Sequence, residues 1–218
     1  MVTLALLHTS SVHVPVFDAL RDEDHPGLAL RHLVHEGLLD RARRDGPEAV
    51  ADELGAVLER AVADGAGAVL CTCSTIGGVA EARAAALGVP VLRVDRPMAA
   101  AAVTAGPAVT VLATVASTLR PTVALLAEEA ERAARPVDVR TVLVDGAWER
   151  FEAGDRDGYV ALIAAAVERA DADGADVVVL AQASMADAAA RGAVRVPVLA
   201  SPRPGLRAAA ALCGGPRS

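Results

Sequence analysis

Two cysteines and a group of hydroxyl residues stand close together in residues 69–78, whose sequence is VLCTCSTIGG. The apolar residues before Cys73 predict a buried strand, and the Ser, Thr and Gly residues after it predict the start of a helix. The unpaired N–H groups and positive dipole end of such a helix would favour the thiolate form of Cys73 and could also hold a carboxylate. Cys73 is therefore the candidate general acid, general base or nucleophile. Cys71, inside the predicted strand, is expected to be a core residue.

The other reactive residue types exclude several kinds of site. Cys213 lies in a predicted C-terminal helix and is expected to be inert, and the three cysteines indicate no disulfide framework. The C-x-C spacing has no second Cys or His pair in the matching half, so no metal site is expected. All 21 basic residues are arginine, which excludes a Schiff-base lysine and a P-loop. All the histidines lie in the first 35 residues, and only His8 and His13 lie near the end of the first predicted strand.

The composition of the 218 residues indicates a folded protein that binds neither nucleic acid nor membrane. Hydrophobic residues make up 53% and charged residues 22%, and the mean hydropathy is +0.38. Charged residues, Gly or Pro interrupt every apolar run before the ~20 residues that a membrane-spanning helix needs. A net charge of -7 with 2% aromatic residues provides neither a basic surface nor a stacking platform for nucleic acid. The first residues have no signal-peptide pattern, so a cytoplasmic location is expected.

The sequence repeats itself. Residues 63–76, ADGAGAVLCTCSTI, align without a gap with residues 172–185, ADGADVVVLAQASM, at a shift of 109. The same shift carries residues 28–37 onto residues 137–146. At the outer ends the shift becomes 107, in two further pairs of segments: 2–7 with 109–114, and 89–97 with 196–204. The chain is therefore expected to consist of two related halves.

Each half alternates short apolar runs with helical patterns, as in α/β proteins. The predicted strands are residues 2–8, 28–34, 67–72 and 90–94, then 108–114, 137–144, 176–181 and 196–200. The predicted helices are residues 14–22, 47–63 and 78–87, then 120–134, 156–171 and 205–213. Near-continuous apolar strands that alternate with helices imply a parallel sheet covered on both faces.

The predicted fold is thus α/β, with two tandem, pseudo-symmetric, Rossmann-like lobes and a cleft between them. The first lobe comprises residues 1–96, on which residues 205–218 are expected to pack. The second lobe comprises residues 97–204.

Polar residues follow the predicted strands in both lobes. Ligands of open parallel sheets bind beyond the carboxyl ends of the strands. The residues at these positions are His8 to Ser11, Glu36, Cys73 to Thr75, Asp95, Arg96, Ser117, Thr118, Asp145, Gln182 to Ser184 and Arg203. Their hydroxyl groups are typical helix caps, but the repeat relates them in pairs, so the same groups could also grip an anion.

Several short segments resemble the aspartate/glutamate racemase superfamily, which includes hydantoin racemases, maleate isomerases and arylmalonate decarboxylases. These segments are CST after the third predicted strand, VLATVAST at the start of the second lobe, and LAQASM ahead of VPVL. Together with the two tandem lobes, they extend the resemblance over nearly the whole chain. The resemblance implies chemistry without a cofactor at the carbon next to the carboxylate of a small acid, and it implies a homodimer.

In the racemases of this superfamily, one cysteine from each lobe faces either side of the substrate carbon. Carried over by motif, the first cysteine is Cys73, whereas Gln182 stands at the second position, at the repeat shift of 109. A glutamine amide can neither take nor give the proton, but it can orient a substrate or stabilise an enolate oxygen. The chain thus resembles a divergent member without the second catalytic cysteine. The group opposite Cys73 is left open among four residues: His8, His13, Glu36 and Asp145.

The resemblance and the strand-end positions together imply a cradle for the substrate carboxylate, made of hydroxyl and N–H groups. The expected members are Ser10, Ser11, Ser74, Thr75, Ser117, Thr118, Ala183 and Ser184. Arg96 and Arg203, which correspond under the repeat, could add positive charge, although solvated or lobe-bridging arginines are more common.

Three classes of function follow from these residues. The leading hypothesis is an isomerase of the racemase or epimerase type, with Cys73 as acid/base and with His8 and Gln182 as further catalytic candidates. The alternative is a decarboxylase or other lyase that uses a single cysteine and an enolate-like intermediate. The third is a carboxylate-binding protein that has lost catalysis. Neither the substrate nor the choice among these classes follows from the sequence.

Overall fold

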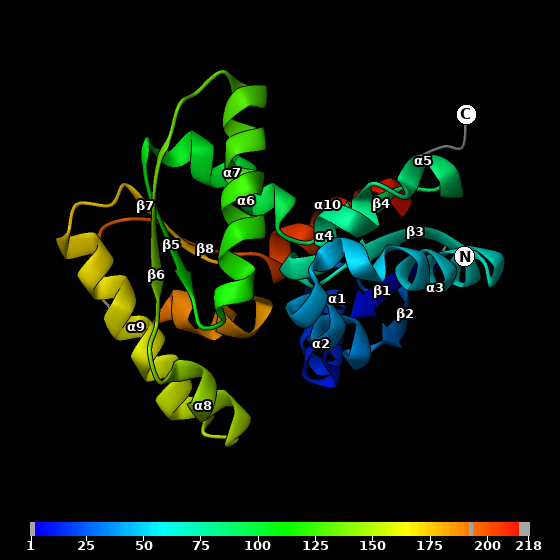
Figure 1. The fold of residues 1–218 in the computed structure, drawn as a ribbon, viewed down its shortest axis with the longest axis horizontal. Coiled ribbons are helices and arrows are strands. Elements are labelled where there is room, and N and C mark those ends of the chain that lie inside the picture. Colours follow the sequence, from blue (N-terminus) through cyan, green and yellow to red (C-terminus); the bar gives the residue numbers. More distant parts are fainter. Residues whose placement is uncertain (1–2, 192–193, 214–218) are drawn as a thin grey trace. The chain divides into compact units, whose positions relative to one another are not determined.

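The computed structural model describes residues 3–191 and 194–213, which form two compact units (Figure 1). The described residues up to Val94 and those from Pro202 onward form unit 1, whereas Asp95–Ser201 form unit 2. Each unit has its own four-stranded sheet. Residue 2 of the first predicted strand and residues 214–218 of the predicted C-terminal segment lie outside the described residues.

The sheet of unit 1 has the strand order β2-β1-β3-β4, and its paired strands are parallel. Its strands are β1 (Thr3–His8), β2 (Ala29–Val34), β3 (Ala66–Cys71) and β4 (Val91–Arg93). Its helices are α1 (Val14–Asp24), α2 (Glu36–Asp45), α3 (Ala51–Ala63), α4 (Ser74–Glu81), α5 (Ala84–Leu87) and α10 (Pro202–Cys213), with the short 3-10 helices η1 (Ser11–His13) and η2 (Pro47–Val50).

Alternate residues of β1 pack on opposite faces of the sheet, because successive side chains of a strand point in opposite directions. Leu4 and Leu6 share a buried cluster with Phe17 of α1 and Leu206 of α10. The neighbouring residues of β1 share a second cluster with buried residues of α2, α3 and α4. The sheet of unit 1 is therefore covered by helices on both faces, as the sequence predicts.

Helix α10 completes unit 1 although it follows unit 2 in the chain. It contacts α1, β1 and β3. A Cβ atom placed on Gly205 would lie 2.5 Å from the carbonyl oxygen of Val94, just after β4. Only glycine therefore permits this close approach between α10 and the end of the sheet.

Unit 2 repeats the architecture, with the strand order β6-β5-β7-β8. Its strands are β5 (Ala108–Ala113), β6 (Asp138–Leu143), β7 (Val177–Leu180) and β8 (Val198–Ala200), and they pair in parallel. Its helices are α6 (Arg96–Ala105), α7 (Leu119–Ala133), α8 (Ala147–Glu152) and α9 (Arg156–Ala172), with the 3-10 helices η3 (Ala116–Thr118) and η4 (Ala183–Ala190). None of the helices among the described residues combines the length and the hydropathy needed to cross a membrane.

All the predicted strands are present, with ends that differ by at most two residues over the described part of the chain. Three helices, α2, α6 and α8, were not predicted. Helix α4 begins at Ser74, the first of the Ser, Thr and Gly residues expected to start a helix, and four residues before the predicted range 78–87; α10 begins at Pro202 rather than at residue 205. The whole Ser-Thr-x-Gly-Gly segment therefore lies inside α4.

The strand registers correct one part of the predicted repeat. Cys71 of β3 and Leu180 of β7 correspond at the predicted shift of 109. Cys71 pairs with Leu7 of β1, and Leu180 pairs with Leu112 of β5. Leu7 therefore corresponds to Leu112 at a shift of 105, and the predicted shift of 107 is wrong for this strand.

The corrected shift changes which strand-end residues are equivalent. Thr9 corresponds to Thr114, and Ser10 corresponds to Val115. The predicted equivalence of Ser10 and Ser11 with Ser117 and Thr118 is therefore wrong. The 3-10 helices agree with the corrected shift, since η1 begins at Ser11 and η3 begins at Ala116.

Candidate functional site

Cys73 lies in unit 1, between the carboxyl end of β3 and the first residue of α4. It is the N-cap residue of α4, with extended backbone angles of φ -108° and ψ 115°. Its side chain belongs to the apolar cluster that includes Ile76 and Val79, and the residue keeps 9% of its surface exposed. Cys71, by contrast, has no exposed surface, and its Sγ donates to the carbonyl of Cys73 at 3.7 Å. The strand residue is a core residue, whereas the cap residue retains some access.

Two predicted cradle residues, Ser74 and Thr75, form the first turn of α4. Both are buried, and the chain at this point begins the helix whose N–H groups have no intrahelical partner. The backbone of α4 lies close to Arg93 of β4, because a Cβ on Gly77 would lie 2.9 Å from the Cβ of Arg93. Glycine at this position therefore lets the helix pack on a buried arginine.

The hydroxyl residues after β1 differ in their surroundings. Ser10 is half-buried and caps η1 without a side-chain capping bond. Ser11 is exposed, and both its N–H and its hydroxyl donate to Glu36 Oε1 at 3.4 Å. The carboxylate of Glu36 thus uses the donors of Ser11 and would repel a second carboxylate there.

His8 lies inside unit 1 at the end of β1, with no exposed surface. Its Nδ1 lies 2.8 Å from the hydroxyl of Thr72, and its Nε2 lies 2.8 Å from Nδ1 of His32. Both ring nitrogens are therefore occupied by protein groups. His8 does not present a nitrogen to a ligand, and its contact is with the residue before Cys73.

The hydrogen-bond network assigns the tautomer of His8. The hydroxyl of Thr72 donates to the carbonyl of Leu7 at 3.1 Å, so it must accept from Nδ1–H of His8. Nε2 of His8 then accepts from Nδ1–H of His32, whose other ring nitrogen lies 3.3 Å from the carboxylate of Asp18. Burial, with smaller contributions from His32 and His13, lowers the pKa of His8 to about 3. His8 is thus a neutral link.

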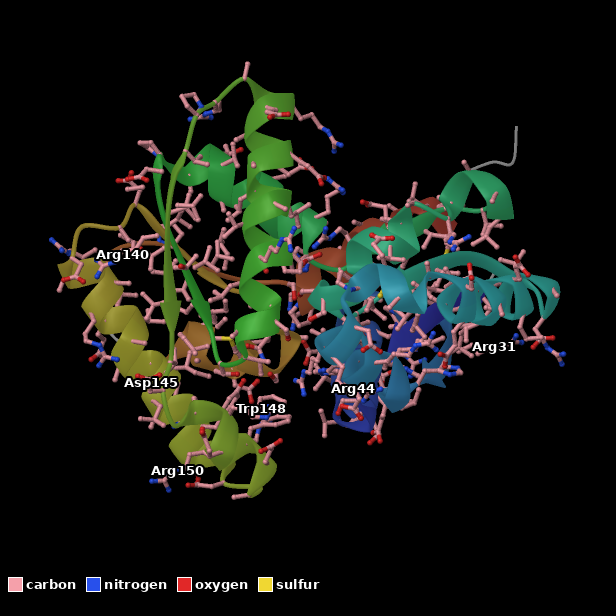
Figure 2. All side chains as sticks on the ribbon, in the orientation of Figure 1. Arg31, Arg44, Arg140, Asp145, Trp148 and Arg150 are labelled. Carbon is pink, nitrogen blue, oxygen red and sulfur yellow. The ribbon has the colours of Figure 1, made fainter. Side chains whose placement is uncertain are left out.

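The other candidates for the group opposite Cys73 lie on different elements. His13 is half-buried at the end of η1, and its ring centroid lies 6.3 Å from that of His8. Asp145 is exposed in the segment between β6 and α8, where Figure 2 labels it.

In unit 2, Gln182 occupies the position equivalent to Cys73, at the carboxyl end of β7. Its side-chain oxygen accepts three hydrogen bonds: from the N–H of Thr114 at 2.6 Å, from the hydroxyl of Thr114 at 3.0 Å, and from the N–H of Val115 at 3.2 Å. Gln182 is the N-cap residue of η4, whose first residue, Ala183, is buried. The amide is therefore held at the end of the sheet by its oxygen.

Ser184 belongs to the same cluster through a tyrosine. The hydroxyl of Tyr159, on α9, lies 2.8 Å from the hydroxyl of Ser184. Burial of Tyr159 raises the pKa of its hydroxyl, and nearby hydroxyl groups, with Ser184 first, oppose this shift. Tyr159 therefore holds Ser184 as a neutral hydroxyl.

Ser117 and Thr118 end the 3-10 helix η3 of unit 2. Thr118 is buried, and its carbonyl accepts from the hydroxyl of Thr122 at 2.9 Å. The hydroxyl oxygen of Ser117 is buried and has no hydrogen-bond partner among the described residues. Ser117 is thus the one predicted cradle residue in the described part of the chain whose hydroxyl is buried without a partner.

The two predicted arginines form ion pairs within their own units. Arg96 pairs with Glu129, which is buried, and with Glu128. Arg203 pairs with Glu23 and Asp24 of α1. Neither arginine bridges the units through these pairs, and each has an acidic partner nearby.

The predicted site residues are thus divided between the units. Unit 1 contains Cys73, Ser74 and Thr75, which are consecutive at the start of α4, and Ser10 and Ser11 after β1; unit 2 contains Gln182, Ala183 and Ser184 after β7, and Ser117 and Thr118 in η3. Sequence reasoning missed Thr72, His32, Thr114 and Tyr159, of which Thr114 would have been found with the shift of 105. Among the described residues, no group of three or more His, Cys, Asp or Glu side chains is arranged to hold a metal ion.

Comparison with solved structures finds the same two-lobed architecture. The aspartate racemase of Picrophilus torridus superposes with a TM-score of 0.73 at 12% identity, over 100% of this chain and 96% of that chain. The allantoin racemase of Pseudomonas fluorescens gives a TM-score of 0.63 at 21% identity, over 97% and 90% of the two chains. At these identities the likeness establishes the fold.

A third structure is a liganded mutant of arylmalonate decarboxylase, in which a glycine is replaced by cysteine and a cysteine by serine. It gives a TM-score of 0.63 at 20% identity, over 100% of this chain and 95% of that chain. No curated protein sequence matches the chain significantly. The sequence profile of the Asp/Glu/Hydantoin racemase family, however, matches residues 14–209. This match covers most of the chain, and the chain therefore belongs to the Asp/Glu/Hydantoin racemase family.

Proposed function

We propose that this protein is a cofactor-independent enzyme that moves a proton at the carbon next to the carboxylate of a small acid, with Cys73 as the acid/base. The single observation that carries the proposal is the placement of Cys73. Cys73 caps α4 and keeps 9% of its surface exposed, directly before the buried hydroxyl residues Ser74 and Thr75. The positive end of a helix stabilises negative charge, so this position suits both a thiolate and a carboxylate.

In the proposed reaction, the thiolate of Cys73 removes the proton from the carbon, and the electron pair of the broken C–H bond moves into the carboxylate as an enolate. The N–H and hydroxyl groups of Ser74 and Thr75 stabilise the charge that develops on the carboxylate oxygens. A second group then delivers a proton to the opposite face of the carbon, which inverts the centre, because return of the proton from Cys73 itself would restore the starting acid. Loss of one such donor typically lowers the rate about 100- to 1,000-fold.

His8 has a supporting part in this proposal. Its ring lies within hydrogen-bonding distance of Thr72, the residue before Cys73, and its second nitrogen contacts His32. We therefore assign His8 the role of a positioning residue for the segment that carries Cys73, and not that of a group that touches the substrate.

A second candidate function is a decarboxylase with one cysteine, and the presence of a glutamine at position 182 favours it. Of the two equivalent positions, only Cys73 carries a thiol, and the amide of Gln182 has no proton that it can transfer near neutral pH. In decarboxylation, the bond between the carbon and a carboxylate breaks, carbon dioxide leaves, and the thiol of Cys73 donates its proton to the resulting enolate. That reaction needs one proton donor, whereas racemisation needs proton transfer on both faces.

Incubation in heavy water tests the proposal and separates the two reactions. Wild-type protein is incubated with small acids that carry an amino, hydroxyl or aryl substituent and with the corresponding malonates. Deuterium in the recovered acid, its chirality and released carbon dioxide are measured. We expect turnover by the wild type and a loss of about 100- to 10,000-fold in Cys73→Ser, because the thiol is the general acid/base.

Cys213→Ser is the matched control, since it removes a thiol near the C-terminal end of α10. It should keep the wild-type rate. An unchanged rate in Cys73→Ser would contradict the assigned role of Cys73. Acid binding without deuterium exchange or carbon dioxide release in the wild type would identify a binding protein instead.

A further inference from the structure

The side chain of Gln182 has a fixed orientation. Its oxygen accepts from three donors, which we call the Thr114–Val115 donor set: the N–H and hydroxyl of Thr114 and the N–H of Val115. Only the oxygen of an amide can accept from an N–H group, so the amide cannot be flipped without losing these bonds. The nitrogen, Nε2, is therefore the end of Gln182 that remains to donate to a ligand.

The hydroxyl of Thr114 also donates to the oxygen of Gln182, at 3.0 Å, which adds a third donor to the two N–H groups. Two residues further along η4, the hydroxyl of Ser184 lies 2.8 Å from the hydroxyl of Tyr159.

The same donors would otherwise suit an anion. Two consecutive N–H groups and a hydroxyl that converge on one oxygen form the kind of group that stabilises a carboxylate or an enolate oxygen. In unit 2 the neutral oxygen of Gln182 already occupies this position. A substrate carboxylate would have to displace three hydrogen bonds, which weakens its binding by at least about tenfold.

Unit 1 lacks this internal occupant. The residues equivalent to Thr114 and Val115 are Thr9 and Ser10, and the residue equivalent to Gln182 is Cys73. The cysteine side chain ends one atom beyond Cβ, so it is too short to reproduce the contacts of the glutamine amide. The difference between the units therefore comes from the side chain at this single position.

We infer that Gln182 is a specificity-determining residue, whose oxygen fills the Thr114–Val115 donor set and whose Nε2 is offered to a neutral acceptor oxygen of the substrate. This inference rests on the proposed function and names the class of its substrate. We expect an acid with one carboxylate and a neutral carbonyl or hydroxyl oxygen, in preference to a dicarboxylic acid.

Sodium formate is a direct probe of the donor set, because it supplies a carboxylate without a side chain. In Gln182→Ala, we expect formate to produce saturable shifts of the ¹H–¹⁵N resonances of Thr114 and Val115 and to raise the melting temperature. The wild type and Ser184→Ala keep Gln182 and should show neither effect. Sodium chloride at the same ionic strength controls for salt.

Gln182→Glu keeps the test decisive if Gln182→Ala fails to fold. The carboxylate of the new glutamate would accept from the same three donors, so its pKa should fall below the ordinary value of about 4.3. A pKa at or above that value, or a formate response equal in wild type and Gln182→Ala, would overturn the inference. These readouts need no turnover, so they stand or fall separately from the proposed reaction.

Discussion

The carboxyl ends of the two sheets share a backbone plan but stabilise different groups. In unit 1, the buried polar side chains of His8 and Thr72 lie at the ends of β1 and β3, directly before the segment that carries the thiol. In unit 2, the equivalent positions are Ala113 and Ala181, which offer no hydrogen bond from their side chains.

Unit 2 places its polar contacts one residue further along the chain. There the side-chain oxygen of Gln182 accepts from the N–H and the hydroxyl of Thr114. Unit 1 therefore has a hydrogen-bonded pair next to Cys73, whereas in unit 2 the equivalent residue, Gln182, makes the hydrogen bonds with its own side chain. The comparison teaches that a duplicated fold can give its two equivalent positions different contacts by changing few side chains.

The largest effect is expected from His8, whose network has no counterpart in unit 2. His8→Ala leaves Thr72 and His32 without their shared partner in a buried site, so the free energy of unfolding should fall by about 2 to 3 kcal/mol. Urea unfolding of the two proteins at neutral pH measures this loss. His35→Ala, which removes a histidine outside the network, is the matched control and should cost less.

The stability of unit 1 should also depend on pH through His8, which has no counterpart in unit 2. Its folded-state pKa of about 3 lies below the ordinary value of 6.5. Between these values the unfolded chain binds a proton that the folded chain does not, so stability falls as the pH decreases through this range, by up to about 1.4 kcal/mol per pH unit. His8→Asn cannot titrate and should show a shallower decrease between about pH 6.5 and about pH 5. Parallel curves for wild type and His8→Asn would show that the groups facing His8, namely His13, His32 and Asp18, carry the acid sensitivity.

A smaller effect is expected from Tyr159, whose hydroxyl contacts that of Ser184 in unit 2. Tyr159→Phe removes this hydroxyl, and one hydrogen bond of this kind is worth about 1 kcal/mol. Urea unfolding of the two proteins measures the loss. Equal stability of Tyr159→Phe and wild type would show that the contact with Ser184 contributes nothing.

The smallest effect is expected from Ser117, whose buried hydroxyl has no partner among the described residues. Ser117→Ala removes that unsatisfied group, so stability should stay within about 0.5 kcal/mol of wild type or rise slightly. Thermal unfolding measures this change. A loss above about 1 kcal/mol would mean that the hydroxyl has a stabilising partner, and lower substrate affinity at unchanged stability would support its predicted place in the carboxylate cradle.

The fold was largely predictable because buried parallel strands leave a strong sequence signal. The central strands are short, continuous runs of apolar and β-branched residues, and such runs are typical of buried strands rather than of helices. Helix α2 lacks such a signal, since its sequence, EGLLDRARRD, is dominated by charge and only Leu38 and Ala42 are buried. Helix α6 begins at Arg96, directly at the predicted boundary between the lobes, where no helix was predicted.

The error in the repeat has a similar physical origin. The two segments VTLALL and VTVLAT share their first two letters and a similar apolar pattern at a shift of 107, but their strands pair with the neighbouring strands at a shift of 105. A displacement of two residues leaves every side chain on the same face of the strand, so the apolar pattern cannot distinguish the two alignments. Hydrogen-bond register, which fixes the equivalence of Thr9 and Thr114, is not encoded in that pattern.

The candidate site was predictable only where its residues are close in sequence. Cys73, Ser74 and Thr75 are consecutive, and Gln182 follows from them by the repeat. Tyr159, however, reaches Ser184 from a helix with many buried apolar residues, and nothing in its sequence neighbourhood indicates a polar contact. Partners of this kind depend on how helices pack on the sheet.

The position of α10 in the chain has a consequence for biosynthesis. This helix completes the apolar layer around Phe17 in unit 1, yet the ribosome makes it only after the whole of unit 2. Domains tend to fold as they emerge from the ribosome, so unit 2 can fold while unit 1, although synthesised earlier, still lacks Leu206 and Ala209 of α10. We therefore expect nascent chains arrested before Pro202 to contain a folded unit 2 and an incompletely folded unit 1, whose exposed apolar residues bind chaperones until α10 is released from the ribosome and packs on them.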